Sequence, residues 1–181
     1  MDFNDVIFTR RSVRKYLPRV VEKEKLEAVL KAGAYAPTAM NNRNRKFVAV
    51  TKPELLSRLN AAVEKSADEA TVERIRSRNG GRFDFFYSAP VLIFVVSSDK
   101  LYPAADCACA NENMFLAAKN EGLGTCWINQ LYSAGEKPEL REFYREIGIN
   151  DDEKVYGCCA LGYADGETPL SKPKNDEIII L

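Results

Sequence analysis

A basic cluster near the start of the sequence holds the densest set of groups that could bind a ligand. Arg10, Arg11, Ser12 and Arg14 bring three guanidinium groups and a hydroxyl together within five residues. Guanidinium is planar and donates in a fork that matches phosphate oxygens, so this spacing favours a phosphate receptor. A solvated basic turn would have the same composition, and the cluster alone leaves both interpretations open.

A pair of lysines near the other end of the sequence could serve the same anion. Lys172 and Lys174 flank Pro173, and in an extended segment residues two apart project in similar directions. On its own the pair is typical of a charged tail. If the chain brings both clusters to one place, they could hold a phosphate that neither would hold as well singly.

Two loops carry groups suited to a flat heterocycle. Residues 36–43 (APTAMNNR) offer amide and hydroxyl groups that can bind the edge of a ring, although a helix-terminating loop has the same composition. Residues 121–130 (EGLGTCWINQ) place two glycines before an expected buried strand, where backbone could approach a flat ligand closely. The alternative is a helix C-cap, which explains Gly122 and leaves Gly124 optional.

The absence of histidine removes several classes of enzyme. Ser-His and Cys-His nucleophile systems, H-E-x-x-H zinc sites and imidazole acid–base steps are excluded. The hard chemistry of an enzyme with this composition would belong to a cofactor, or to carboxylates, tyrosine and lysine.

Charge and cysteine usage narrow the setting further. The 26 basic and 26 acidic residues balance, so no net field favours nucleic acid or a membrane. Five cysteines without C-x-x-C spacing indicate free, mostly buried thiols in a reducing compartment rather than a metal site. The acidic stretch Met1–Asp5 lacks the features of a signal peptide, and the apolar run Ala89–Val96 is far below the ~20 residues that span a bilayer. We therefore expect a cytoplasmic protein.

Hydrophobic periodicity predicts helices and strands in alternation over a single domain, residues 1–181. The expected helices are a short one through Phe3–Ile7 and four over 26–34, 53–63, 103–122 and 136–147. The expected strands are 46–51, 91–96, 124–128 and 155–163. The run 91–96 (VLIFVV) lacks alternation, which is typical of a central strand covered on both faces. This interleaving favours an α+β fold or a three-layer α/β/α arrangement.

Two segments stand outside this pattern. Residues 66–88 change from charged to aromatic across Asn79-Gly80-Gly81, which is typical of a variable insertion or lid. The aromatic residues at 83 and 85–87 could gate a substrate, although core packing is the more common role for such residues. The apolar residues Ile178–Leu181 need a sheet to join, which a partner subunit could supply.

The ordered set of motifs resembles the nitroreductase family. R-R-S-x-R is followed by A-P-T-A-M-N, D-C-A-x-A-x-x-N-M-x-L-A-A, G-L-G-T-C-W-I and A-L-G-Y, and the matches run from Arg10 to Lys174. The resemblance implies an FMN-binding fold with a mixed central sheet flanked by helices. It also implies an intertwined homodimer with one FMN in each of two interface clefts. No catalytic side chain is implied, because the chemistry takes place at flavin N5.

The resemblance assigns cofactor contacts to residues in all the clusters above. Arg10, Arg11, Ser12 and Arg14 would bind the FMN phosphate, ribityl chain and pyrimidine edge, and Lys172 and Lys174 would complete the phosphate site. Pro37, Thr38, Met40 and Asn41 would reach the flavin from the other subunit. Cys126, Trp127, Ile128, Asn129 and Gln130 would belong to the flavin site as well, the last three lining the ring near N5. No metal is implied.

Two positions depart from the family pattern. Relatives often have a Glu-Gly pair where this chain has Asn129-Gln130, which changes the hydrogen bonding near N5. Relatives also often continue the loop as N-x-Q-P-W, whereas Arg43 stands at the glutamine position here. Arg43 could stabilise negative charge on the pyrimidine ring of the reduced flavin, adapt the site to another substrate, or point into water.

The activity implied is that of an FMN-dependent oxidoreductase. It would move hydride or electrons from NADH or NADPH to a small planar acceptor, nitroaromatic or quinone-like, by a ping-pong mechanism. Three alternatives stay open: a flavin-storage protein with little turnover, a flavin enzyme of another reaction type on the same fold, and a phospholigand binder without flavin.

Overall fold

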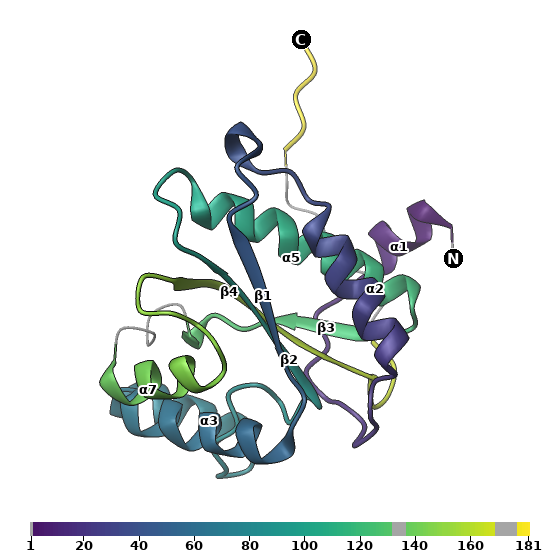
Figure 1. The fold of residues 1–181 in the computed structure, drawn as a ribbon. Helices are drawn as coiled ribbons and strands as arrows, with labels where there is room; N and C mark the ends of the chain where they lie inside the picture. Colours follow the sequence, from purple (N-terminus) through teal and green to yellow (C-terminus); the bar gives the residue numbers. More distant parts are fainter. Residues whose placement is uncertain (1, 132–136, 169–176) are drawn as a thin grey trace.

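The computed structural model describes residues 2–131, 137–168 and 177–181. Within them the chain forms a four-stranded sheet, which lies at the centre of Figure 1. Its strands are β1 (Arg45–Val50), β2 (Val91–Ser97), β3 (Gly124–Trp127) and β4 (Lys154–Gly162), in the order β1-β2-β4-β3. Each pair is antiparallel, and the registers place Ile93 between Ala49 and Cys159.

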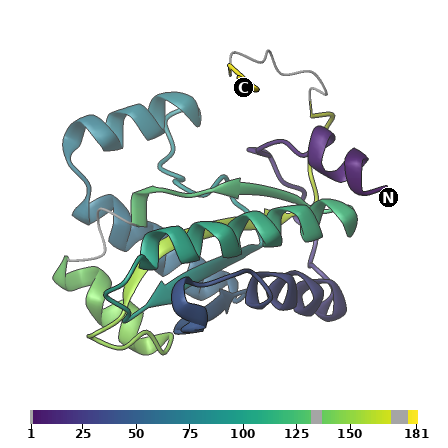
Figure 2. The ribbon, with the colours of Figure 1, turned by 90° about the horizontal axis from the view of Figure 1, so that it is seen from above.

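Helices cover both faces of this sheet. They are α1 (Phe3–Thr9), α2 (Lys23–Ala34), α3 (Pro53–Ser66), α4 (Glu69–Arg78), α5 (Pro103–Asn120) and α7 (Pro138–Glu146), with a 3₁₀ turn η1 (Ala39–Asn41). α2 and α5 pack together on one face, and α3 and α7 pack together on the other (Figures 1 and 2). The predicted three-layer α/β/α arrangement is therefore confirmed, and the predicted elements lie within a few residues of the observed ones.

The sheet differs from the expected mixed sheet in one respect. All its strand pairings are antiparallel, and over residues 2–131, 137–168 and 177–181 the only parallel pairing is an isolated bridge between Ser12 and Thr125. The mixed character is thus confined to the point where the segment after α1 meets β3.

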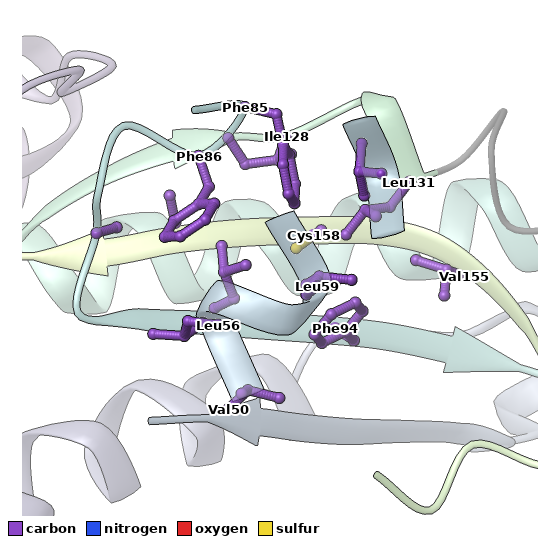
Figure 3. Close-up of a cluster of buried hydrophobic side chains, with 14 of the residues drawn as sticks. Val50, Leu56, Leu59, Phe85, Phe86, Phe94, Ile128, Leu131, Val155 and Cys158 are labelled. Atoms are coloured by element: carbon purple, nitrogen blue, oxygen red, sulfur yellow. The ribbon is translucent and has the colours of Figure 1, made fainter. Parts of the chain in front are cut away.

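The two faces of β2 belong to two different halves of the core. Leu92, Phe94 and Val96 join the cluster under α3 and α7, which Figure 3 shows in close-up. Val91, Ile93 and Val95 face the opposite way and join the cluster under α2 and α5. Every residue of β2 is buried. This confirms the expectation, drawn from its unbroken apolar run, of a central strand covered on both faces.

The segment 66–88 divides into a helix and a buried aromatic stretch. α4 begins after Asp68, whose carboxylate accepts a hydrogen bond from the Thr71 N–H at 2.8 Å, and it stands apart from the other helices in Figure 2. The predicted insertion or lid, residues 66–88, contains this helix, but the helix itself was not predicted. Phe83, Phe85 and Phe86 are buried in the α3/α7 cluster, so their interpretation as core residues is confirmed. A lid could therefore comprise only the part of the segment that precedes Phe83.

All five cysteines are free thiols, and four of them are buried. Burial raises the pKa of Cys107 to about 12 and also raises that of Cys158, because a thiolate in the core would lose its hydration. Cys109 on α5 is exposed. The expectation of free, mostly buried thiols is confirmed.

Candidate functional site

Residues 10–14, here called the basic segment, run alongside the edge strand β3. The Val13 N–H donates to the Thr125 carbonyl at 2.8 Å, and Ser12 forms the parallel bridge with Thr125. The Val13 side chain fills the space that a side chain at Gly124 would need, since a Cβ added there would lie 2.5 Å from Val13 Cγ2. Gly124 therefore admits the basic segment itself. Two interpretations were open for Gly124, close approach to a flat ligand or an optional position after a helix C-cap, and neither anticipated this packing against Val13.

Gly122 has the simpler role that the sequence allowed. It follows α5 with a φ of +75°, in the left-handed region that favours glycine, and its N–H donates to the Lys119 carbonyl at 3.1 Å. The helix C-cap interpretation is thus confirmed for Gly122.

Side chains of the basic segment alternate between the core and the surface. Val13 is buried, whereas Ser12 and Arg14 are exposed. Burial raises the pKa of the Cys126 thiol on β3, and this rise is opposed by the Arg14 charge, a hydrogen bond with Ser12 and the Arg10 charge. The Ser12 hydroxyl and the charges of Arg10 and Arg14 therefore all act on the Cys126 thiol.

The guanidinium groups at the start of the basic segment are already held in place. Arg10 lies 3.3 Å from a Glu112 carboxylate oxygen, with its guanidinium 5.8 Å from the centre of the Phe115 ring. Arg11 donates to the Phe8 carbonyl at 2.9 Å. Both arginines line a hollow of about 150 Å³ together with Lys119. Three cations around one small hollow suit a phosphate group.

The segment after β4 returns to the basic segment. Tyr16 and Ala164 form an antiparallel bridge, the Asp165 N–H donates to the Lys15 carbonyl at 2.9 Å, and Thr168 lines the hollow that Arg10 and Arg11 line. Lys172 and Lys174 follow soon after Thr168 in the sequence, but both lie outside the described residues. Their contribution to a phosphate site stays a prediction, supported by the direction from which the chain arrives.

A second region, the loop over residues 36–43, is anchored at its base by two charged side chains. The buried Asp106 carboxylate accepts the Ala39 N–H at 3.0 Å. Arg45, the first residue of β1, donates to the carbonyls of Ala36 at 2.6 Å, Pro37 at 3.3 Å and Asp106 at 2.8 Å. Neither residue was singled out from the sequence as a site residue. The sequence marks only Asp106, because this residue begins the D-C-A motif of the long helix.

The crest of the 36–43 loop is exposed and has unusual backbone geometry. Met40, Asn41 and Arg43 have φ values of +54°, +53° and +56°, which residues with side chains rarely adopt. The Met40 side chain is 87% exposed. Arg43 donates from Nε to the Asn41 side-chain oxygen at 2.9 Å, and its N–H donates to the Thr38 hydroxyl at 3.1 Å. Strained, exposed backbone of this kind is typical of a ligand-binding loop.

The loop and the basic segment lie at different points along α5. Asp106 anchors the loop, and Glu112 contacts Arg10. At a helical rise of 1.5 Å per residue these two positions are roughly 9 Å apart along the helix axis. The loop and the basic segment therefore contact different turns of α5, and the expected contact of Met40 and Asn41 with the flavin of the other subunit stays a prediction.

The segment 126–130 splits between the core and a cleft. Cys126 and Ile128 are buried in the α3/α7 cluster, where Figure 3 labels Ile128. Trp127 points the other way and stacks edge-on against Phe115 at 6.4 Å between ring centres. Any contact of Ile128 with a flavin would thus have to come from its main chain. Asn129 and Gln130 line a cleft of about 370 Å³ with residues from the end of α3 and the start of α4.

Two side chains of that cleft, Arg74 on α4 and Lys137 before α7, were not predicted as site residues.

Within the described ranges, no group of histidine, cysteine, aspartate and glutamate side chains is placed to hold a metal ion. Over the same ranges no helix combines the length and apolarity needed to cross a bilayer.

Comparison with known proteins places the chain among flavoproteins. A sequence model of the Nitroreductase family matches residues 7–163. The chain is 30% identical over 168 residues to an Archaeoglobus fulgidus protein provisionally named NADH dehydrogenase/NAD(P)H nitroreductase, with 90% of this chain and 85% of that protein covered. It is 27% identical over 205 residues to nitrobenzene nitroreductase of Ectopseudomonas oleovorans, with 92% and 88% covered.

A solved structure shares the fold over its full length. The crystal structure of a nitroreductase with bound FMN from Bacteroides fragilis NCTC 9343 matches with a TM-score of 0.90 and 36% sequence identity. The match covers 100% of this chain and 99% of that one. The architecture inferred from the sequence is therefore that of known FMN-containing relatives.

Proposed function

The chain belongs to the nitroreductase family, and on this premise we propose that it is an FMN-dependent oxidoreductase. It carries electrons from NADH or NADPH to small planar acceptors, such as nitroaromatic compounds or quinones. The names of the two relatives support the donor and the nitroaromatic class of acceptor. The FMN in the Bacteroides fragilis nitroreductase supports the cofactor.

The observation that carries this proposal is the donor set of the basic segment. Backbone pairing of Ser12 and Val13 with Thr125 fixes the basic segment against β3, and Arg10 and Arg11 line the hollow of about 150 Å³ together with Lys119. Guanidinium and hydroxyl groups suit the phosphate and the carbonyl-rich pyrimidine edge of FMN. Within the described residues, the Arg10 guanidinium pairs with the Glu112 carboxylate, and Arg11 donates to the carbonyls of Phe8 and Arg10.

The protein contributes position and electrostatics. When bound, FMN would supply the redox chemistry that couples oxidation of NADH or NADPH to reduction of the acceptor in ping-pong order. The basic segment holds the phosphate end of the cofactor and thereby fixes where its ring lies. Asn129 and Gln130 offer amide groups at the ring edge, next to the cleft that donor and acceptor occupy in turn.

The complete site requires two copies of the chain. The exposed 36–43 loop extends away from the basic segment of its own chain, so a twofold-related partner would bring its loop to the flavin. Side chains that a partner would cover include Phe3 and Phe8 on α1 and Tyr102 before α5, all more than half exposed. We therefore assign the protein as a homodimer with a flavin in each of two interface clefts.

The apolar residues 178–181 fit the same assembly. Ile180 is 92% exposed, and these residues stand clear of the rest of the chain in Figure 1. The outer side of β3 is occupied by Ser12 and Val13, whereas β1 is paired on one side only within the described residues. The open side of β1 in the partner is thus the edge that these residues can join as an added strand.

The experiment that tests the function is an anaerobic visible absorption spectrum of the FMN-reconstituted protein. The flavin bands are expected to bleach with NADH or NADPH and to return when a nitroaromatic or a quinone is added. Bands that no nicotinamide bleaches would favour a flavin-storage protein. Failure to retain any flavin would overturn the proposal.

A matched pair of variants tests the assignment of the phosphate site. Arg14→Gln removes an exposed cation of the basic segment next to its pairing with β3, and it is expected to weaken FMN binding about tenfold, the loss of one charge-assisted hydrogen bond. Lys15→Gln removes the same charge from the neighbouring residue, which pairs with Asp165 at the surface, and should leave the affinity unchanged. Fluorescence titration of FMN measures both, and equal losses would contradict the assignment.

A further inference from the structure

The cleft of about 370 Å³ beside Asn129 and Gln130 lies between the expected flavin segment and the junction of α3 with α4. Its floor is the buried Val63, and Ser66, Asp68 and Thr71 line the side formed by the helix junction. A volume of this size lies at the lower end of small-molecule sites and accommodates a single substituted ring.

Two cations border this cleft, Arg74 from α4 and Lys137 from the residue before α7. Both are exposed, and over the described ranges neither takes part in a recorded ion pair or side-chain hydrogen bond. Other arginines nearby differ in this respect. Arg76 pairs with Glu64 at 2.7 Å, and Arg58 pairs with Glu146 at 2.6 Å.

The one carboxylate that lines the cleft is already engaged. Asp68 accepts the Thr71 N–H at 2.8 Å and the Thr71 hydroxyl at 3.0 Å as the N-cap of α4. These two hydrogen bonds, and to a lesser degree the Arg74 charge, lower the pKa of the Asp68 carboxyl. The capping bonds hold Asp68 at the helix end, so the cleft presents two cations to a ligand against one occupied anion.

We infer that this cleft selects acceptors that carry an anionic group, such as a carboxylate, on the ring that is reduced. The ring stacks at the flavin beside Asn129 and Gln130, and Arg74 and Lys137 bind the carboxylate at the other end. This inference rests on the proposed function, because it is the proposed function that places a flavin next to Asn129 and Gln130.

The test compares 4-nitrobenzoate with 4-nitrobenzamide, which has the same ring without the charge. Each is titrated by calorimetry into the FMN-reconstituted protein in the absence of nicotinamide. The carboxylate is expected to bind about tenfold more tightly, as befits a charge-assisted contact in a partly exposed cleft. The preference should shrink as salt is added, because the pairing groups are open to solvent.

Three variants locate the source of the preference. Arg74→Gln and Lys137→Gln should each reduce the preference for the carboxylate several-fold while leaving the amide unchanged. Arg78→Gln removes the same charge one turn further along α4, outside the cleft, and should leave the preference intact. Equal affinities for the two ligands in the wild type, or no measurable binding of either, would overturn the inference. An equal loss in Arg78→Gln would also overturn it, since it would indicate a diffuse field.

The same samples keep this inference separate from the proposed function. FMN retention and bleaching by NADH or NADPH are read from the visible spectrum, and charge preference is read from the calorimeter. A protein that holds and turns over FMN with no preference refutes the anionic acceptor alone. A protein that retains no FMN refutes the proposed function.

Discussion

The basic segment and the 36–43 loop both carry predicted flavin contacts, yet they are held in opposite ways. The basic segment pairs with β3 through main-chain hydrogen bonds, and Val13 fills a space left by Gly124. In the described part of the chain, no strand pairs with the loop. Two side chains, Asp106 and Arg45, tie its base to α5 and β1, while its crest holds three residues with positive φ.

In the proposed homodimer, this difference would match a division of roles between the two chains. A segment that binds the cofactor of its own subunit can be built into the sheet of that subunit. A loop that must fit a partner's cofactor has to project from its own chain and keep its shape without support at its tip. The side chains at its base then fix its conformation, and the strain at its crest is retained because those contacts determine it.

The largest effect is expected from Gly124→Ala, which disrupts the contact between the basic segment and β3. The new Cβ would lie 2.5 Å from Val13 Cγ2, so the basic segment must move off β3. We expect a loss of about 2 kcal/mol in the free energy of unfolding, typical of overpacking, together with loss of FMN binding. Urea denaturation measures the first and fluorescence titration the second. Val13→Ala should restore part of both in the double variant, and strictly additive losses would contradict this contact.

The corresponding substitution for the 36–43 loop is Arg45→Met. The substitution leaves three carbonyl oxygens without the donor that they share. We expect a loss of about 1.5 kcal/mol in the free energy of unfolding, because partly buried acceptors lose a charged partner. FMN should also be retained less well, but only in the proposed dimer, because there the loop of one chain would contact the cofactor of the other. Lys46→Met, at the next position of β1, removes a cation that pairs with Glu153 instead and is the matched control.

A smaller effect on stability is expected at Tyr163, the residue that follows β4. The Tyr163 hydroxyl donates to Glu22 at 2.5 Å, and this bond, with others, lowers the Glu22 pKa from 4.5 to about 2. A carboxyl with a lowered folded pKa stabilises the fold above its ordinary pKa. That stabilisation is lost as the pH falls from 4.5 towards 2.

Tyr163→Phe tests this dependence. The variant should be less stable than the wild type at about pH 6, and the gap should narrow by about pH 2.5. Denaturation midpoints at both values measure the gap. A gap that stays constant would show that the hydroxyl acts through Lys25, which it also contacts at 3.1 Å, rather than through Glu22.

The smallest expected effect concerns the crest of the projecting loop. Arg43 is exposed and held by Asn41, so any charge that it lends to the partner's flavin is screened by water. Arg43→Gln is expected to make the flavin harder to reduce by on the order of 10 mV, which corresponds to a surface electrostatic contribution. Spectroelectrochemical titration measures the midpoint potential. An unchanged potential would leave Arg43 a role in substrate choice or in the loop alone.

The sequence predicted the frame of this molecule better than the details of its site. The unbroken apolar run of β2 and the caps at Pro53, Pro103 and Gly122 depend on local chemistry, which a sequence displays directly. The pairing of Ser12 with Thr125 could not be predicted from the sequence, because no local pattern links residues so far apart. The family resemblance assigned residues of both segments to the flavin site without predicting that they pair.

Two features of the site lay beyond any local pattern. Arg45 reads as an ordinary charged residue at the start of a strand, and only the fold shows that it binds three carbonyls. Arg74 lies in a helix rich in charge, where one unpaired cation among several has no signature. The packing at Gly124 was not anticipated for a related reason, since the group that approaches it comes from the chain itself.

The buried thiols described above can report the rate at which the core of the protein opens. Cys107, Cys126, Cys158 and Cys159 are buried with raised pKa values, so an alkylating reagent reaches them only when the core opens. Cys109 reacts from the folded state and marks the start of the reaction. The rate at which the remaining mass increments appear in a mass spectrometer then reports the opening of both halves of the core. Cys158 and Cys159 are neighbours on opposite faces of β4, one in each cluster, so one peptide can reveal whether the two halves open together.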